Sequence, residues 1–315
     1  MRWAWALLLA AAALAPGASS PARAADAVLD RVRATGVVRC GAEERPGVAA
    51  PTREEGIGGL AVDLCRAIAV AVLGPGGRVV FRLYDSDRDF AAVRQGEDDV
   101  SFLTGGAIAK RQLAASILPG PTVFIERIAV MVPETAPIHG IGDLEGRAVC
   151  LLTGSPAQRA LEAVAKRDHL TFARLSFQEE VEMLDAYNVQ RCQAVVGEAA
   201  QLAEMRRTGG VNRLRSRLLP APLALSPLVA ATGVSDARWS ALVAWVVNAL
   251  ILGDGPAFPA RGPLPGLRPA WQSEVRAEVG DYGAIVRRSL TEALGLDPGP
   301  NAAWPDGLLL APAVE

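Results

Sequence analysis

The stretch LAVDLCRAIAVAV, residues 60–72, is apolar at helical spacing and lies between two β-rich runs. The first run is 37–40, and the second is 78–84, which follows a Gly-Pro-Gly-Gly break. Farther along the chain the pattern predicts a helix at 87–94 and a third strand at 100–103. The order βαβαβ implies a parallel sheet with helices on both faces.

A second alternation of the same kind begins at residue 148. Its expected strands and helices are 148–152, 157–166, 170–175, 178–187, 194–196 and 199–207. An apolar strand at 128–132 leads into this half, and another at 225–231 leads back. We therefore expect two α/β lobes that share two crossing strands, an arrangement that forms a hinge. The predicted division is 25–127 for the first lobe, 128–227 for the second, and 228–315 for the return and the C-terminal helices.

Three helices are expected after the return. The first is 236–252, with Ser235 as the candidate N-cap residue, and the others are 270–279 and 282–294.

The N-terminus has the three parts of a signal peptide. Arg2 is followed by an apolar run at 3–15 and then by Ala22-Arg23-Ala24. A membrane anchor is the alternative, but a span needs about 20 apolar residues. We expect residues 1–24 to be removed and the mature protein to be periplasmic.

Composition excludes several classes of function. The formal net charge is −2, so no basic surplus indicates nucleic acid. His139 and His169 are the only two histidines, which argues against a metal site and leaves few candidate bases for a catalytic triad. No G-x-x-x-x-G-K, G-x-G-x-x-G or G-x-S-x-G motif occurs. We expect neither an enzyme nor a cofactor.

Four cysteines in an exported chain suggest disulfides. Three pairings are open, and four buried free thiols are the alternative. The pairing of Cys40 with Cys65 and of Cys150 with Cys192 keeps each bridge within one half of the chain.

Candidate ligand-binding residues follow the predicted strands, where such sheets bind ligands. In the first lobe they are Thr104 and Gly105, then Arg111, whose guanidinium suits a carboxylate. A solvated surface arginine is the alternative for Arg111.

In the second lobe, Gly154 and Ser155 open a helix whose N–H groups can bind an anion. An ordinary helix cap at Ser155 with Pro156 in the first turn explains the same residues. Glu198 can pair with an ammonium group, or it can serve only as a carboxylate at a helix N-terminus.

These residues resemble the periplasmic binding proteins of polar amino-acid ABC importers, especially the general L-amino-acid-binding branch. The resemblance covers nearly the whole mature chain, and its motifs are Val38-Arg39-Cys40-Gly41, Gly59 to Ala67, Gly96-Glu97-Asp98-Asp99-Val100, Lys110-Arg111, Gly146 to Cys150, Ala186-Tyr187, Arg191-Cys192, Val279 to Gly283 and Asn301-Ala302-Ala303-Trp304.

The resemblance implies a type II periplasmic-binding-protein fold that closes around an amino acid or a related zwitterion. It implies that Arg111 and Thr104 bind the ligand carboxylate, with backbone N–H groups at Gly154 and Ser155, and that Glu198 binds the ammonium group. Glu43 would begin the side-chain pocket. The cysteines fall where that branch has its own, which supports the pairing above. The partners implied are the membrane subunits of an ABC transporter, and we expect a monomer.

The chain departs from the family at the predicted site. Gly106-Ala107-Ile108 replaces a Thr/Ser-x-Thr sequence, Gly154-Ser155-Pro156 replaces Gly-Thr-Thr, and Glu198 replaces an aspartate. These changes leave the ligand open. An exported enzyme resembling cyclohexadienyl dehydratase, or a sensor or orphan receptor with an altered or decayed site, is the alternative function.

Overall fold

The computed structural model describes residues 27–52, 56–84, 88–106, 108, 117–208, 214–253 and 265–311. The predicted signal peptide and Arg111 lie outside the described residues.

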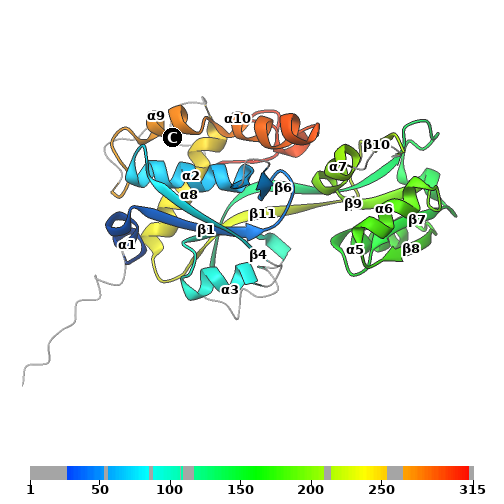
Figure 1. The fold of residues 1–315 in the computed structure, drawn as a ribbon, viewed down its shortest axis with the longest axis horizontal. Coiled ribbons are helices and arrows are strands. Elements are labelled where there is room, and N and C mark those ends of the chain that lie inside the picture. Colours follow the sequence, from blue (N-terminus) through cyan, green and yellow to red (C-terminus); the bar gives the residue numbers. More distant parts are fainter. Residues whose placement is uncertain are drawn as a thin grey trace, which may run out of the picture.

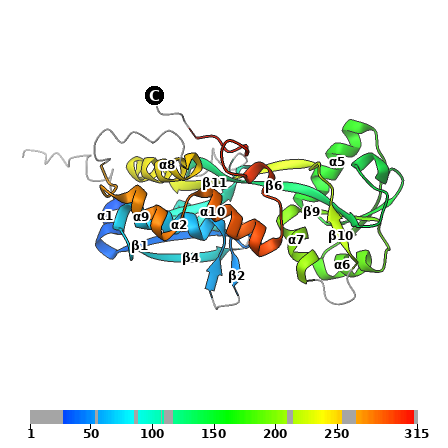
Figure 2. The same cartoon turned by 90° about the horizontal axis from the view of Figure 1, so that it is seen from above.

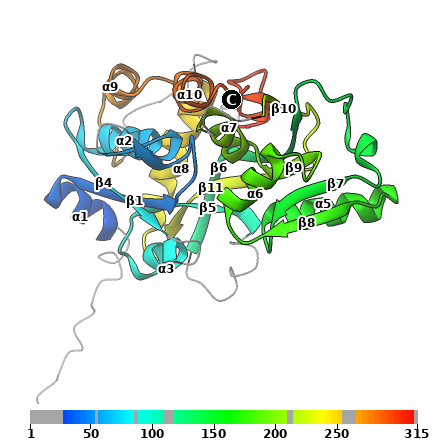
Figure 3. The same cartoon turned by 45° about the vertical axis from the view of Figure 1, so that its right-hand side comes forward.

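We call the N-terminal βαβαβ unit, together with the C-terminal helices, lobe 1. Its parallel strands are β1 (Val37–Glu43), β4 (Arg78–Tyr84) and β5 (Val100–Thr104), with β1 in the middle. Its first helices are α1 (Ala27–Thr35), α2 (Leu60–Leu73) and α3 (Arg88–Gln95). Helix α2 and helix α3 cover opposite faces of the sheet, as the sequence predicts (Figures 1 and 3).

Lobe 2 repeats the pattern with β7 (Ala148–Leu152), α5 (Pro156–Asp168), β8 (Ala173–Phe177), α6 (Glu180–Asn188), β9 (Ala194–Glu198) and α7 (Ala199–Thr208). Strand β7 runs parallel to both β8 and β9. The prediction of a strand at 170–175 was wrong by about half its length, since β8 begins at Ala173. Strand β10 (Ser216–Leu218), which pairs with the end of β6, was not predicted from the sequence.

Two long strands run between the lobes (Figure 1). They are β6 (Ile117–Pro133) and β11 (Ala224–Gly233), which are antiparallel to each other. Strand β11 also pairs with β5 of lobe 1, and β6 with β9 of lobe 2. The main sheet is therefore continuous in the order β4-β1-β5-β11-β6-β9-β7-β8. The β11–β6 ladder is interrupted by register shifts between Leu228 and Val229 and between Val229 and Ala231.

The C-terminal part of lobe 1 contains α8 (Ala237–Leu252), α9 (Trp271–Glu278), α10 (Tyr282–Val286), η3 (Arg287–Glu292) and η4 (Gly299–Asn301). The predicted N-cap at Ser235 was wrong, because the Asp236 carboxylate accepts the hydrogen bond from Trp239 N at 2.8 Å. The same side chain accepts hydrogen bonds from the backbone of Val28 and Leu29 in α1. Asp236 thus joins two helices that are far apart in the sequence.

Short elements fill the remaining connections. Strands β2 (Ala50–Thr52) and β3 (Gly56–Gly58) form a hairpin in the loop after β1. A 3-10 turn, η2 (Ile141–Leu144), follows β6.

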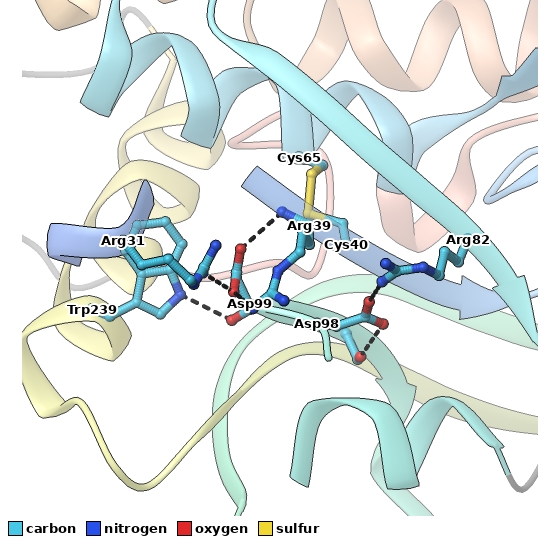
Figure 4. The surroundings of a disulfide bond; sticks show 9 residues. Arg31, Arg39, Cys40, Cys65, Arg82, Asp98, Asp99 and Trp239 are labelled. Atoms are coloured by element: carbon cyan, nitrogen blue, oxygen red, sulfur yellow. Dashed lines mark hydrogen bonds and ion pairs between the residues drawn. A yellow bond between two sulfur atoms is a disulfide. The ribbon is translucent and has the colours of Figure 1, made fainter. Parts of the chain in front are cut away.

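Both predicted disulfides form, Cys40 with Cys65 in lobe 1 and Cys150 with Cys192 in lobe 2. The first lies beside a buried carboxylate, Asp99, whose side chain is ion-paired with Arg31 and Arg39 (Figure 4). The indole of Trp239 donates a 2.9 Å hydrogen bond to the Asp99 carbonyl oxygen. These contacts tie β1, β5, α1 and α8 into one core.

Within the described part of the chain, no helix has the length and apolar character to cross a membrane. The same residues hold no group of three or more histidine, cysteine or carboxylate side chains placed to bind a metal.

Candidate functional site

The predicted site residues of lobe 1 lie at the ends of β1 and β5. Glu43 is the last residue of β1, and Thr104 is the last of β5. Thr104 is opposite Leu228 of the crossing strand β11. A side chain at Gly105 would meet Pro227 of β11 at 3.0 Å, so glycine lets this turn lie against the crossing strand.

Arg45 joins the end of β1 to the crossing strand β6. One guanidinium nitrogen lies 3.3 Å from a carboxylate oxygen of Glu43, and another lies 3.5 Å from Glu126. The side chains of Arg45 and Glu126 are only 15% and 5% exposed. Two buried charges of opposite sign therefore meet where lobe 1 continues into the hinge, an arrangement that depends on good pairing.

Glu198 brings lobe 2 into the same cluster. It ends β9, where Ile128 of β6 is its partner in the ladder. Burial raises the pKa of the Glu126 carboxyl; the nearby Arg45 lowers it, and the negative charge of Glu198 raises it further. Burial lowers the pKa of the Arg45 guanidinium, but Glu126, Glu43 and Glu198 together raise it above its ordinary value. We call Glu43, Arg45, Glu126 and Glu198 the hinge cluster.

Backbone contacts fix the position of Glu126. The N–H of Arg127 donates a 3.0 Å hydrogen bond to Glu126 Oε1. The backbone of Ala200, in the first turn of α7, also donates to this carboxylate and favours its charged form. The positive end of the α7 dipole adds to that effect. Glu126 is thereby held between the crossing strand and the first helix after Glu198.

The helix tip at Gly154 and Ser155 is organised by its own side chains. Ser155 Oγ accepts from Gln158 N at 3.1 Å, as expected of an N-cap residue. The N–H of Gly154 donates to Gln158 Oε1 at 2.8 Å. Gly154 has a φ of 72°, which favours glycine at this turn. The cap interpretation accounts for these two residues, and a role in ligand binding stays a prediction.

Glu43 and Glu198 both act electrostatically on Arg45, whereas Arg111 lies outside the described residues. Within the described ranges, no hydrogen bond or ion pair joins Gly154 or Ser155 to the hinge cluster. Sequence reasoning missed Arg45 and Glu126. Arg45 lies two residues after Glu43, which the resemblance had placed in the side-chain pocket, and this position was a usable signal. Glu126 is a single glutamate before an apolar strand, and the sequence carried no signal for it.

Known proteins resemble the chain over almost its whole length. It is 27% identical over 336 residues to the general L-amino acid-binding periplasmic protein AapJ of Rhizobium johnstonii, covering 98% of this chain and 97% of that protein. It is 24% identical over 332 residues to the glutamate/glutamine/aspartate/asparagine-binding protein BztA of Rhodobacter capsulatus, covering 96% of each. No protein-family model matches the chain.

Among solved structures, a periplasmic binding protein from Brucella ovis with glutathione bound superposes with a TM-score of 0.72 at 24% identity. The match covers 89% of this chain and 96% of that one. The fold is thus the type II periplasmic-binding-protein fold, as predicted. The predicted resemblance is also confirmed: AapJ is named as a periplasmic amino-acid-binding protein, BztA as an amino-acid-binding protein, and a further relative, YhdW of Escherichia coli, as a putative amino-acid ABC transporter-binding protein.

Proposed function

We propose that the protein is the periplasmic substrate-binding component of an ABC importer and that it captures an amino acid or a related small zwitterion between its lobes. The hinge cluster carries this proposal, because it draws on lobe 1, lobe 2 and a crossing strand at once. A ligand that contacts both lobes favours the closed state by its differential affinity for that state. The homologues named for amino-acid binding support the ligand class.

The hinge cluster favours an ammonium group. It contains three carboxylates, from Glu43, Glu126 and Glu198, and one guanidinium, from Arg45. Glu126 is engaged by Arg45 and by the backbone of α7, which leaves Glu198 as the carboxylate from lobe 2 available to a ligand cation. We assign the ligand carboxylate to Arg111, assisted by Thr104, Gly105 and the helix tip at Gly154 and Ser155.

The proposal includes the export and the division of the chain. Residues 1–24 would be the signal peptide, 25–127 and 228–315 would form lobe 1, and 128–227 would form lobe 2. AapJ, which is named as a periplasmic protein, supports this location. N-terminal sequencing of protein recovered from the periplasm should begin at Ala25, and sedimentation should give a monomer. Retention of Arg2 in the recovered protein would contradict the cleavage.

Calorimetric titration with the twenty amino acids tests the ligand class. We expect saturable binding of at least one of them. Glu198→Gln and Arg111→Ala should each weaken that binding at least about tenfold, because each removes a charge-assisted hydrogen bond to the ligand. Glu44→Gln, a neighbouring exposed carboxylate, is the matched control and should leave the affinity unchanged.

Two results would contradict the proposal. The first is full affinity in both site variants, which would remove their assigned roles. The second is the absence of amino-acid binding together with turnover of a prephenate-like acid, which would favour the enzyme alternative.

A further inference from the structure

The two crossing strands pair with each other over a short stretch between the lobes. The ladder of β11 with β5 ends at Leu228, and the ladder of β6 with β9 begins at Ile128. Between these points, residues 125–127 of β6 lie opposite residues 225–227 of β11. We call these two facing segments the two-stranded span. Any movement of lobe 2 relative to lobe 1 bends this span or carries it along.

A buried side chain from the C-terminal part of lobe 1 holds the span at Ile125. Asn301 Oδ1 accepts a 2.7 Å hydrogen bond from Ile125 N, and Asn301 Nδ2 donates to the Ile125 carbonyl oxygen at 2.9 Å. The N–H and C=O of one strand residue point to the same edge, so the amide takes the place of a neighbouring strand there. Pro227, opposite Ile125 on β11, has no N–H to offer.

The segment that leads to Asn301 starts from the core of lobe 1. We call residues 295–301 the strap. Leu296 packs in the main apolar core, and its N–H donates to the Leu290 carbonyl oxygen at 3.1 Å. The N–H of Gly295 donates to the Thr291 carbonyl oxygen at 3.0 Å. Figure 2 shows the chain after η3 approaching α7 of lobe 2.

The strap also contacts the span and lobe 2. Arg127 of the span donates to the Asp297 carbonyl oxygen at 2.6 Å, and Arg206 of α7 donates to the Gly295 carbonyl oxygen at 3.1 Å. A side chain at Gly299 would begin 2.7 Å from Arg127 Nη1, so the guanidinium packs directly against the strap. The strap therefore touches lobe 1, the span and lobe 2.

Both C-terminal sequence motifs, 279–283 and 301–304, meet β6 through their polar side chains. The Tyr282 hydroxyl donates a 3.0 Å hydrogen bond to the Val123 carbonyl oxygen, two residues before the position that Asn301 holds. Neither motif has a part in the proposed ligand contacts. Their shared partner is the crossing strand, which indicates a role in the relative position of the lobes.

We propose that the strap restrains the movement of the two lobes. The register shifts next to Leu228 lie on the lobe 1 side of the span, so bending there moves the span together with lobe 2. The bonds from Asn301 to Ile125 and from Arg206 to the strap oppose that movement, because hydrogen bonds weaken steeply with distance and angle. The effect of the strap on ligand capture rests on the proposed function, whereas its effect on the lobes exists without ligand.

Double electron–electron resonance on the ligand-free protein measures the distance between the lobes. Spin labels are attached at Glu278→Cys in α9 and Lys166→Cys in α5, where both positions are exposed. The four native cysteines are held in disulfides and do not take the label. Asn301→Ala and Arg206→Gln should each broaden the distance distribution, because each removes one attachment of the strap.

The second variant keeps the test valid if the first misfolds, because the bond from Arg206 to Gly295 is exposed to solvent. Matched controls remove the same kinds of bond inside one lobe. Asn188→Ala removes a 3.1 Å hydrogen bond from Leu214 N, and Arg78→Gln removes a 3.1 Å hydrogen bond to the Thr35 carbonyl oxygen. Both controls should keep the distribution of the unmodified protein.

Two results would overturn the proposal. The first is an unchanged distance distribution in the folded strap variants. The second is equal broadening in the controls, which would assign the effect to a general loss of stability. Since no ligand is added, neither result depends on whether the protein binds an amino acid.

Discussion

The two lobes share one pattern of strands and helices but hold their charged groups differently. Lobe 1 buries Asp98 and Asp99 directly before β5 and pairs Asp98 with Arg82 and Asp99 with Arg31 and Arg39. In lobe 2 the ion pair of Arg174 with Glu162 lies on the surface, with side chains 51% and 44% exposed. Charge therefore helps to define the interior of lobe 1, whereas the charged groups of that lobe 2 pair stay in solvent.

The apolar cores of the two lobes also differ. The main core of lobe 1 continues along Ala129 and Met131 of β6 to the side of lobe 2 that α6 and α7 cover. The other side of lobe 2, under α5, is a smaller core of its own, which includes Ile128, Val130 and Leu161. One side of lobe 2 is thus continuous with lobe 1, and the other is independent of it.

The largest effect that tests this comparison is the loss of a buried carboxylate. Asp99→Ala leaves Arg31 and Arg39 without their partner and should lower the free energy of unfolding by up to about 5 kcal/mol. Glu162→Gln, which breaks the exposed pair in lobe 2, should cost no more than about 1 kcal/mol. Urea denaturation measures both, and similar losses would contradict the difference between the lobes.

Removal of the disulfides should affect the two lobes almost equally. Cys150→Ala/Cys192→Ala opens a loop with a sequence separation of 42, and Cys40→Ala/Cys65→Ala opens one of 25. The chain-entropy model gives losses of about 4 and about 3.5 kcal/mol. Hydrogen exchange read by mass spectrometry should place each loss in its own lobe. Increased exchange across both lobes in either variant would show that they unfold as one unit.

Removal of one helix cap in each lobe tests the same difference between the lobes through smaller losses of unfolding free energy. Asp236→Ala leaves three backbone N–H groups, two of them buried, without their acceptor and should cost about 3 kcal/mol. Ser155→Ala removes one cap in lobe 2 and should cost about 1 kcal/mol. Thermal unfolding of the two variants provides the measurement. An equal loss of stability in the two variants would mean that the link between α1 and α8 does not stabilise the fold.

The pH dependence of stability is the smallest expected effect. Burial raises the pKa of the Asp98 carboxyl, so the folded protein keeps a proton that the unfolded chain releases near pH 4. The contribution of this residue to the free energy of unfolding should fall as the pH rises from about 4 through the folded-state pKa. The slope for one group is at most about 1.4 kcal/mol per pH unit. The free energy of unfolding, measured by denaturation at several pH values, should lose this slope in Asp98→Asn. An unchanged slope would show that another group causes the pH dependence.

Sequence patterns predicted what is local and missed what depends on distant contacts. Strands β4 and β7 lie at the predicted residues because their composition and flanking turns are local signals. Strand β8 was misplaced because it is largely exposed, while the apolar residues just before it attracted the prediction. Ser235 and Asp236 are both suitable caps, and contacts with α1 some 200 residues away select Asp236.

The candidate site follows the same rule. Glu198 was predicted because it follows a strand in an alternating α/β pattern, whereas Glu43 was predicted from the resemblance to the binding-protein family. Arg45 meets Glu126 only because a loop after β1 lies against the far strand β6, and their separation in sequence is 81 residues. A local pattern cannot contain that pairing, so the fold had to be known first.

The interrupted ladder between β6 and β11 has a mechanical consequence. Regular pairing holds on the lobe 2 side of Leu228, and the register slips twice within the next few residues toward lobe 1. Irregular pairing of this kind bends and twists a strand while the flanking hydrogen bonds stay intact. Bending of the two crossing strands should therefore concentrate beside Val229. The regularly paired portion should move as one rigid segment and carry lobe 2 with it.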